Sequence, residues 1–266
     1  MNIETLVKIG IEVRDTIISF IKSNPDYGEM LVQRPKDITR KMDMAAEKAL
    51  DNALLARDLS ARIISEELGD RIVGEHPEFM LVVDPIDGST NATCGIPYFC
   101  TSIAYTEKTD IATFDDISMA VICDIQGNIY CAKKGNGAFL NEKLISGKRM
   151  GTRPKPVVSI YSYGVSDVPA GLIELEKKII VRALGSIALD MCFVADGTLD
   201  GLIDTRGLVS GYDIMASALI LKESGGSLTD LKGNDLTDNV QVSGLSILGT
   251  KQNELHDKII QTLDIK

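Results

Sequence analysis

The sequence predicts a layered α/β sandwich built from two halves. In the first half, two helical patterns precede short β-branched runs separated by turn sequences, which is typical of an antiparallel sheet with helices beside it. In the second half, strand and helix patterns alternate along the chain, which indicates an α/β sheet. We expect the halves to span residues 1–147 and 148–266, joined within a stretch rich in Gly, Pro and basic residues, 147–158.

The first half begins with apolar side chains at helical spacing. This spacing predicts a helix over residues 3–22 and a second over about 42–55, with Asp43 in its first turn. The period then changes, and residues 61–67 and 79–84 read as strands, the second ended by Pro85. Residues 97–140 are expected to form an antiparallel meander, because QGN and GNG interrupt their β-branched runs.

The second half is expected to alternate regularly between the two kinds of element. Strands are predicted at 157–163, 179–184, 199–204 and 241–250. Helices are predicted at 171–178, 186–197, 213–223 and 251–263, the third stopped by Gly225 and Gly226.

Composition and charge narrow the functional classes. The 266 residues are 44% hydrophobic, which is enough for a substantial buried interior. A net charge of -10 disfavours nucleic-acid and anionic-membrane partners, which are bound by clustered Lys and Arg. No window approaches the roughly 18 apolar residues of a membrane span, so we expect a cytoplasmic protein without a membrane partner. His76 and His256 lie in polar stretches and are expected at the surface.

An unusual concentration of polar residues follows the apolar run LVV at 81–83. Pro85 favours an extended Asp84 at the end of its strand, and Asp87 follows across a turn that Gly88 permits. Two carboxylates and the carbonyl of Ile86 can therefore converge on one point. Hard oxygen ligands of this kind suit Mg²⁺ or Mn²⁺ rather than zinc.

The next residues have the side chains that begin helices. Ser89, Thr90 and Asn91 are capping types, and a helix N-terminus presents free N–H groups with partial positive charge. Such an end can seat a phosphate, beside the expected metal ligands. The alternative is that DPIDGSTN is only a turn followed by a helix cap.

Three separated acidic motifs together resemble the inositol monophosphatase and fructose-1,6-bisphosphatase superfamily. They are ISEE, DPIDGST and YDIMASALILKESGG, and the resemblance covers nearly the whole chain, including KDITRKMDMAAEKAL and GSIALDMCFVADGTLDGLID. The segments LIDTR and GYD look most like archaeal members that act on both inositol phosphate and fructose bisphosphate. The resemblance implies a sugar-phosphatase fold with layers in the order αβαβα.

The resemblance also implies the residues of a metal site. Glu66 would ligate one ion together with Asp84 and the Ile86 carbonyl, and Asp84, Asp87 and Asp213 would hold a second. Two or three Mg²⁺ ions per site are implied, with Mn²⁺ as the alternative. Carboxylates so close together would repel one another without such cations.

Catalytic and substrate-binding residues follow from the same resemblance. Ser89 would orient the attacking water, Asp43 would support that hydroxyl, and Glu66 would position the water through a metal. The phosphate and substrate contacts implied are Asp87, the backbone of Gly88, Ser89 and Thr90, and then Gly185, Ser186 and Arg206.

The implied activity is Mg²⁺-dependent hydrolysis of a phosphoric monoester by a metal-activated water, without a covalent intermediate. Inositol 1-phosphate and fructose 1,6-bisphosphate are the implied substrates, and a homodimer is expected by analogy. One alternative is a phosphatase of 3'-phosphoadenosine 5'-phosphate or another nucleotide. An alternative of another class is a catalytically silent protein that binds inositol phosphates or metals.

Two residues keep alternative interpretations. Arg206 could grip a second phosphate in a bidentate manner, or it could only form a surface ion pair with Asp204. Asp190 lies in the segment matched on the substrate side, yet it could equally occupy the exposed face of its helix.

Overall fold

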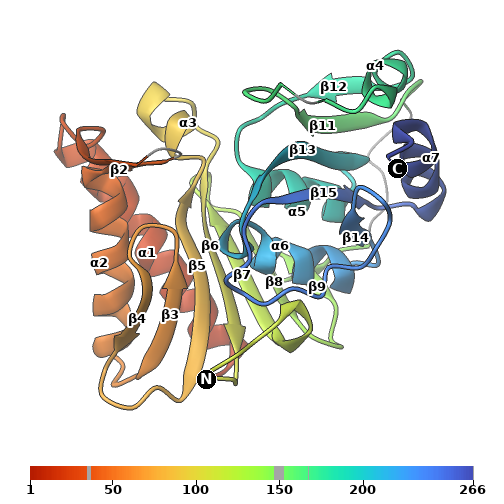
Figure 1. The fold of residues 1–266 in the computed structure, drawn as a ribbon. Coiled ribbons are helices and arrows are strands. Elements are labelled where there is room, and N and C mark those ends of the chain that lie inside the picture. Colours follow the sequence, from red (N-terminus) through yellow and green to blue (C-terminus); the bar gives the residue numbers. More distant parts are fainter. Residues whose placement is uncertain (35–36, 147–152, 167, 266) are drawn as a thin grey trace.

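The computed structural model describes residues 1–34, 37–146, 153–166 and 168–265, without the side chains of Arg34 and Asp37 (Figure 1). Within these ranges, no helix combines the length and the apolar character that a membrane crossing requires.

The larger sheet belongs entirely to the first half of the chain. Its eight strands lie in the order β10-β9-β8-β7-β6-β5-β3-β4. The neighbours run antiparallel except for β3 and β5, which are parallel. The strands are β3 (Ala61–Ser65), β4 (Gly69–Val73), β5 (Phe79–Asp87), β6 (Cys100–Thr106), β7 (Met119–Asp124), β8 (Ile129–Lys133), β9 (Ala138–Leu140) and β10 (Lys143–Leu144).

The smaller sheet belongs to the second half and has five strands in the order β12-β11-β13-β15-β14. Strand β11 is parallel to both neighbours, whereas β15 is antiparallel to β13 and β14. The strands are β11 (Val157–Tyr161), β12 (Ile180–Arg182), β13 (Gly201–Val209), β14 (Ser227–Asp230) and β15 (Leu245–Thr250).

Helices form the layers around and between the sheets (Figure 1). The pair α1 (Ile3–Ser23) and α2 (Lys41–Leu55) packs against the outer face of the larger sheet. The pair α5 (Ile187–Asp196) and α6 (Gly211–Glu223) lies between the sheets, and α4 (Gly171–Glu176) and α7 (Asn253–Leu263) pack together beyond the smaller one. The predicted αβαβα sandwich is therefore confirmed.

The central position of β5 explains its uninterrupted apolar sequence. Met80 and Val82 join the core shared with α5 and α6, whereas Leu81 and Val83 join the core beneath α1 and α2. Because both faces of the strand are covered, every residue from Phe79 to Asp87 is buried.

The structure corrects one predicted boundary at the site. Strand β5 does not stop at Asp84 but continues through Pro85 to Asp87, with a register shift against β6 between the two aspartates. Proline is tolerated at such an irregularity because no regular ladder bond is needed there. Asp87 therefore lies at an irregular strand end rather than beyond a turn.

Other differences concern short or edge elements. The hairpin of β1 (Met30–Arg34) and β2 (Asp37–Arg40) and the strands β4 and β14 were not predicted, and β13 extends to Val209 instead of ending at 204. The short helix α3 (Ser89–Cys94) begins where capping residues predicted a helix start. The predicted boundary between the halves falls at residues 147–148, outside the described residues, and stays a prediction.

Candidate active site

Glu66 and Asp84 come together because each follows the last paired residue of two parallel neighbouring strands. Ser65 of β3 is in register with Val83 of β5, so the residues after them lie side by side. Glu66 occupies the turn after β3 and is half-buried, whereas the Asp84 side chain is buried and accepts a hydrogen bond from the Ile86 N–H at 2.9 Å.

Two further acids begin helices. Asp213 lies in the first turn of α6 and accepts a hydrogen bond from the Ser210 N–H at 2.6 Å. Asp43 has the same place in α2 and accepts one from the Arg40 N–H at 2.7 Å. These capping bonds fix where each carboxylate points. Helix α6 packs against β5 and β6, which brings Asp213 toward Asp84.

The charges of the acids act on one another. Burial raises the pKa of Asp84 well above its usual value, and the negative charges of Glu66, Asp87 and Asp213 raise it further. Burial likewise raises the pKa of Asp87 to about 6, and that of Asp213 to about 7. Four acids from three separate motifs thus lie within electrostatic reach of one another.

Asp87 joins the two halves of the molecule. Its carboxylate accepts hydrogen bonds from the Ser186 hydroxyl, from the Ala188 N–H at 2.8 Å and from the Ile187 N–H at 3.3 Å. These donors stand at the start of α5, where free N–H groups favour a negative charge. Ser186, predicted to contact the substrate, is wholly buried and binds Asp87.

The loop between Asp87 and α3 packs closely against the second half. Gly88 has φ +97°, and Asn91 donates to the carbonyls of Tyr98 at 2.7 Å and Leu184 at 2.8 Å. The Ser89 hydroxyl accepts a hydrogen bond from Arg40 Nη1 at 3.4 Å. Arg40 also provides the N–H that holds Asp43, so it stands between the two residues predicted to act together.

Replacing Gly88 by Ala should weaken both stability and activity. A Cβ there would lie 3.0 Å from Phe99 Cβ, 3.1 Å from the Tyr98 carbonyl oxygen and 3.2 Å from the Gly185 carbonyl oxygen. We expect a loss of about 2 kcal/mol in the free energy of unfolding and of roughly tenfold or more in kcat/KM, because small displacements near the chemistry are costly.

Gly95→Ala is the matched control, since Gly95 ends α3 with φ +72° and a Cβ added there would meet no neighbouring side chain or backbone of the described residues within 4 Å. It should lose stability through backbone strain alone. Equal losses of kcat/KM in the two variants would contradict the prediction that close packing at Gly88 is needed for activity.

Arg206 forms the predicted pair with Asp204, but this pair is not at the surface. Its Nε and Nη2 bond the wholly buried Asp204 carboxylate, with the Nη2 contact at 2.6 Å. The guanidinium also lies over the rings of Tyr161 and Tyr163, 4.9 and 5.0 Å from their centroids. Two of its three nitrogens are therefore engaged, and Nη1 is the one that could contact a ligand.

The acids fit a hard divalent cation by their chemistry. The donors are all oxygens, and their mutual repulsion favours a counter-charge. Ser102 adds a buried hydroxyl without a hydrogen-bond partner among the described residues, and it lies opposite Asp84 in the β5–β6 register. As the side chains of these residues are placed, no three His, Cys, Asp or Glu groups surround one point, because several carboxylates instead bind backbone N–H groups.

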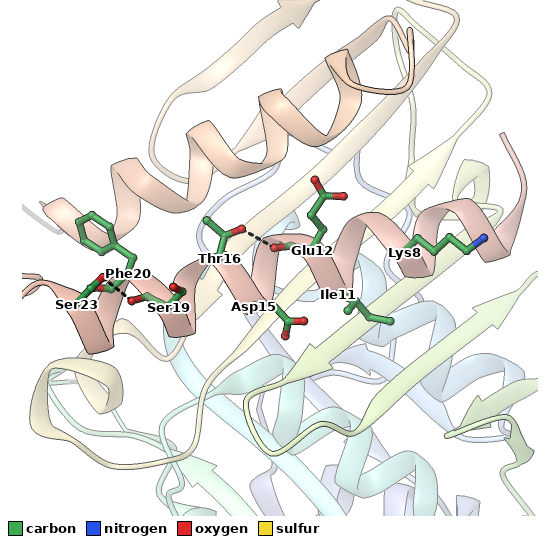
Figure 2. A pocket seen from close by; sticks show the side chains of 8 residues that line it. All are labelled: Lys8, Ile11, Glu12, Asp15, Thr16, Ser19, Phe20 and Ser23. Carbon is green, nitrogen blue, oxygen red and sulfur yellow. Dashed lines mark hydrogen bonds between the residues drawn. The ribbon is translucent and has the colours of Figure 1, made fainter.

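A separate hollow runs along the outer face of α1 (Figure 2). Thr16 there donates to the Glu12 carbonyl at 2.7 Å, and Phe20 lies at one end. None of the predicted site residues lines this hollow.

The αβαβα sandwich, with its acids gathered where its halves adjoin, is the arrangement that the resemblance to the inositol monophosphatase and fructose-1,6-bisphosphatase superfamily implied. The sequence pattern of the inositol monophosphatase family matches residues 2–266. The chain belongs to that family.

Individual relatives agree with this assignment. A fructose-1,6-bisphosphatase/inositol-1-monophosphatase of Methanothermobacter thermautotrophicus is 32% identical over 272 residues, covering 96% of each chain. A solved inositol monophosphatase–fructose 1,6-bisphosphatase superposes with a TM-score of 0.78 at 30% identity, covering 97% of this chain and 98% of its own. A bifunctional NADP phosphatase/NAD kinase of Methanococcus maripaludis is 30% identical over 238 residues, which are 84% of this chain and 42% of that protein.

Proposed function

We propose that the protein is a metal-dependent phosphomonoesterase that hydrolyses inositol 1-phosphate and fructose 1,6-bisphosphate. The observation that carries the proposal is the buried Asp84, with Glu66, Asp87 and Asp213 near enough for their charges to raise its pKa. Such a cluster is costly to keep unless it serves to bind cations. Relatives that bear both activities in their names support the choice of substrates.

The proposed ligands are the carboxylates of Glu66, Asp84, Asp87 and Asp213 and the carbonyl of Ile86, holding two or three Mg²⁺ ions. When bound, Mg²⁺ would supply positive charge to the phosphate and lower the pKa of water. The backbone hydrogen bonds that orient Asp84 and Asp213, and the strand pairing that sets Glu66 beside Asp84, support this arrangement.

The remaining residues position the reactants. The Ser89 hydroxyl would orient the attacking water, with Arg40 and Asp43 fixing that hydroxyl from the start of α2. The N–H groups of Gly88, Ser89 and Thr90 would contact phosphate oxygens as charge builds up on them. Asp87, held by Ser186 and Ala188, would keep its orientation during the reaction.

Arg206 is proposed to select the bisphosphate through Nη1. Arg206→Ala should lower kcat/KM for fructose 1,6-bisphosphate roughly tenfold or more, because a hydrogen bond to a charged group contributes about 1.5–3 kcal/mol. Activity on inositol 1-phosphate should change much less. Arg206→Lys keeps a positive charge beside the buried Asp204 and controls for stability. Equal losses on both substrates would make Arg206 a structural residue.

A nucleotide phosphatase is the second candidate. Tyr163 is 58% exposed and its ring lies beside Arg206, so it offers a surface on which a base could stack. A relative whose name includes NADP phosphatase points the same way.

The test is phosphate release from inositol 1-phosphate, fructose 1,6-bisphosphate, NADP⁺ and 3'-phosphoadenosine 5'-phosphate, with Mg²⁺, with Mn²⁺ and with EDTA. We expect turnover of the first two substrates and none in EDTA. Preference for a nucleotide would favour the second candidate, and no turnover of any ester would favour a silent binding protein. We also propose a homodimer, which light scattering in solution would test.

A further inference from the structure

Asp190 is a buried carboxylate that receives hydroxyl donors from both halves of the molecule. It is wholly buried and accepts hydrogen bonds from the hydroxyls of Tyr98 at 2.6 Å, of Tyr161 at 2.7 Å and of Ser159. Tyr98 lies between α3 and β6 in the first half, whereas Ser159 and Tyr161 belong to β11 in the second. An acid buried so deeply is tolerated because its oxygens are supplied with donors.

The Tyr161 hydroxyl extends this arrangement to the site. It accepts a hydrogen bond from the Gly185 N–H at 2.9 Å while it donates its own proton to Asp190. Its direction is thereby fixed, and so is the Gly185 backbone. Gly185 directly precedes Ser186, whose hydroxyl binds Asp87.

The same backbone packs against the loop that follows Asp87. A Cβ on Gly185 would lie 2.8 Å from Asn91 Nδ2, and a Cβ on Gly88 would lie 3.2 Å from the Gly185 carbonyl oxygen. Asn91 bonds the carbonyls of both Leu184 and Tyr98, so the loop, residues 184–186 and the Tyr98 segment form one packed unit. Asp190 connects the parts of this unit, because it accepts hydrogen bonds from both Tyr98 and Tyr161.

We propose that Asp190 is a positioning residue of the phosphatase: through Tyr161 and Tyr98 it holds residues 184–186 against Gly88 and the start of α3, residues 89–91, and so fixes Asp87 and the substrate side of the site. This inference rests on the proposed function for its effect on turnover. Asp190 contacts no reacting group itself. Its effect passes through Gly185 to Ser186 and Asp87.

The first test is kinetic. Asp190→Asn keeps the shape but replaces one accepting oxygen by an amide that cannot accept, and Tyr161→Phe keeps the ring beneath Arg206 but removes the hydroxyl. Each should lower kcat/KM for inositol 1-phosphate at least tenfold. The double variant should be little worse than the more affected single variant, because both break the same connection.

Tyr130→Phe is the matched control. The Tyr130 hydroxyl donates to Asp196 at 2.8 Å, so this change removes a tyrosine–aspartate bond at the other end of α5, where the tyrosine is buried and the aspartate partly exposed. It should lower the melting temperature as the Tyr161 variant does and leave kcat/KM unchanged. If Tyr161→Phe and Asp190→Asn behave like this control, the inference is overturned.

Hydrogen exchange gives a readout that does not depend on activity. The Gly185 amide should exchange at least tenfold faster in Asp190→Asn and Tyr161→Phe than in the wild type or Tyr130→Phe. Unchanged exchange would overturn the positioning role even in an active enzyme. If the wild type hydrolyses no phosphate ester, the proposed function fails while exchange still decides the role of Asp190. Should Asp190→Asn not fold, Tyr161→Phe and Tyr98→Phe decide both outcomes.

Discussion

Replacing Asp84 by Asn is expected to lower the rate of phosphate release by about a thousandfold or more on every substrate. Asp84 is the buried acid on which the charges of Glu66, Asp87 and Asp213 converge. Its Oδ1 accepts from the Ile86 N–H, a bond that an amide oxygen can keep, so the change removes charge and leaves the strand end intact. A bound cation contributes several kcal/mol to transition-state stabilisation, and each 1.36 kcal/mol is about tenfold in rate.

Asp70→Asn is the control for this change, because it makes the same chemical substitution in the same sheet. Asp70 lies on β4 in an ion pair with Arg62 at 2.6 Å, and its side chain is 40% exposed. Such pairs contribute about 0–1 kcal/mol, and activity should be unaffected. Both variants should be compared at saturating Mg²⁺ after their folding has been checked by circular dichroism. If Asp84→Asn kept more than a tenth of the wild-type rate, the acids would not be the catalytic centre.

Most of the fold and the order of the acids were predictable because they depend on local patterns. Asp43 and Asp213 stand at helix starts that the apolar spacing marks, and Glu66 and Asp84 follow apolar runs that are plain in the sequence. Such features need only a few neighbouring residues to be recognised. The roles proposed for these acids stay predictions until the substitutions are made.

Contacts between residues distant in the sequence could not be predicted in this way. Ser186 binds Asp87 across 99 positions, and Tyr98 binds Asp190 across 92, with no local signal for either bond. The sequence allowed two positions for Asp190, on the substrate side of the site or on the exposed face of its helix. In the structure its side chain is wholly buried.

The surface position predicted for His256 is wrong, although a signal was present. Its ring bonds the hydroxyls of Thr229 and Thr250, both at 2.9 Å, and the side chain is buried. His256 shares one face of α7 with Ile259 and Leu263, at helical spacing. The polar residues beside His256 in the sequence made this buried helix face hard to recognise.

Without divalent cations, the folded protein is expected to lose stability as the pH rises from about 4 to above 7. Burial raises the pKa of Asp87 to about 6 and that of Asp213 to about 7. The folded chain therefore binds more protons than the unfolded chain in this window, so the free energy of unfolding falls as these groups ionise. Since a tenfold difference in acidity corresponds to about 1.4 kcal/mol, the loss should reach several kcal/mol.

Urea unfolding at pH values between 4.5 and 7.5, in EDTA and in Mg²⁺, measures this effect. Mg²⁺ should restore stability at pH 7.5 by about 2.7 kcal/mol at a hundred times its dissociation constant, because it binds only the folded chain.

Asp213→Asn keeps an oxygen for the Ser210 N–H but removes one charge, so in EDTA the free energy of unfolding of this variant should fall less steeply with pH. Surface partners lower the pKa of other acids, such as Asp70 and Asp116. These acids contribute equally to the pH dependence of the wild type and of Asp213→Asn, so their contributions cancel in the comparison. Equal pH slopes for the wild type and Asp213→Asn, with no stabilisation by Mg²⁺, would mean that the carboxylates do not share one repulsive site. The other outcome is a free energy of unfolding that falls more steeply with pH in the wild type than in Asp213→Asn, with Mg²⁺ removing the difference. It would show that a bound cation relieves the repulsion among the carboxylates.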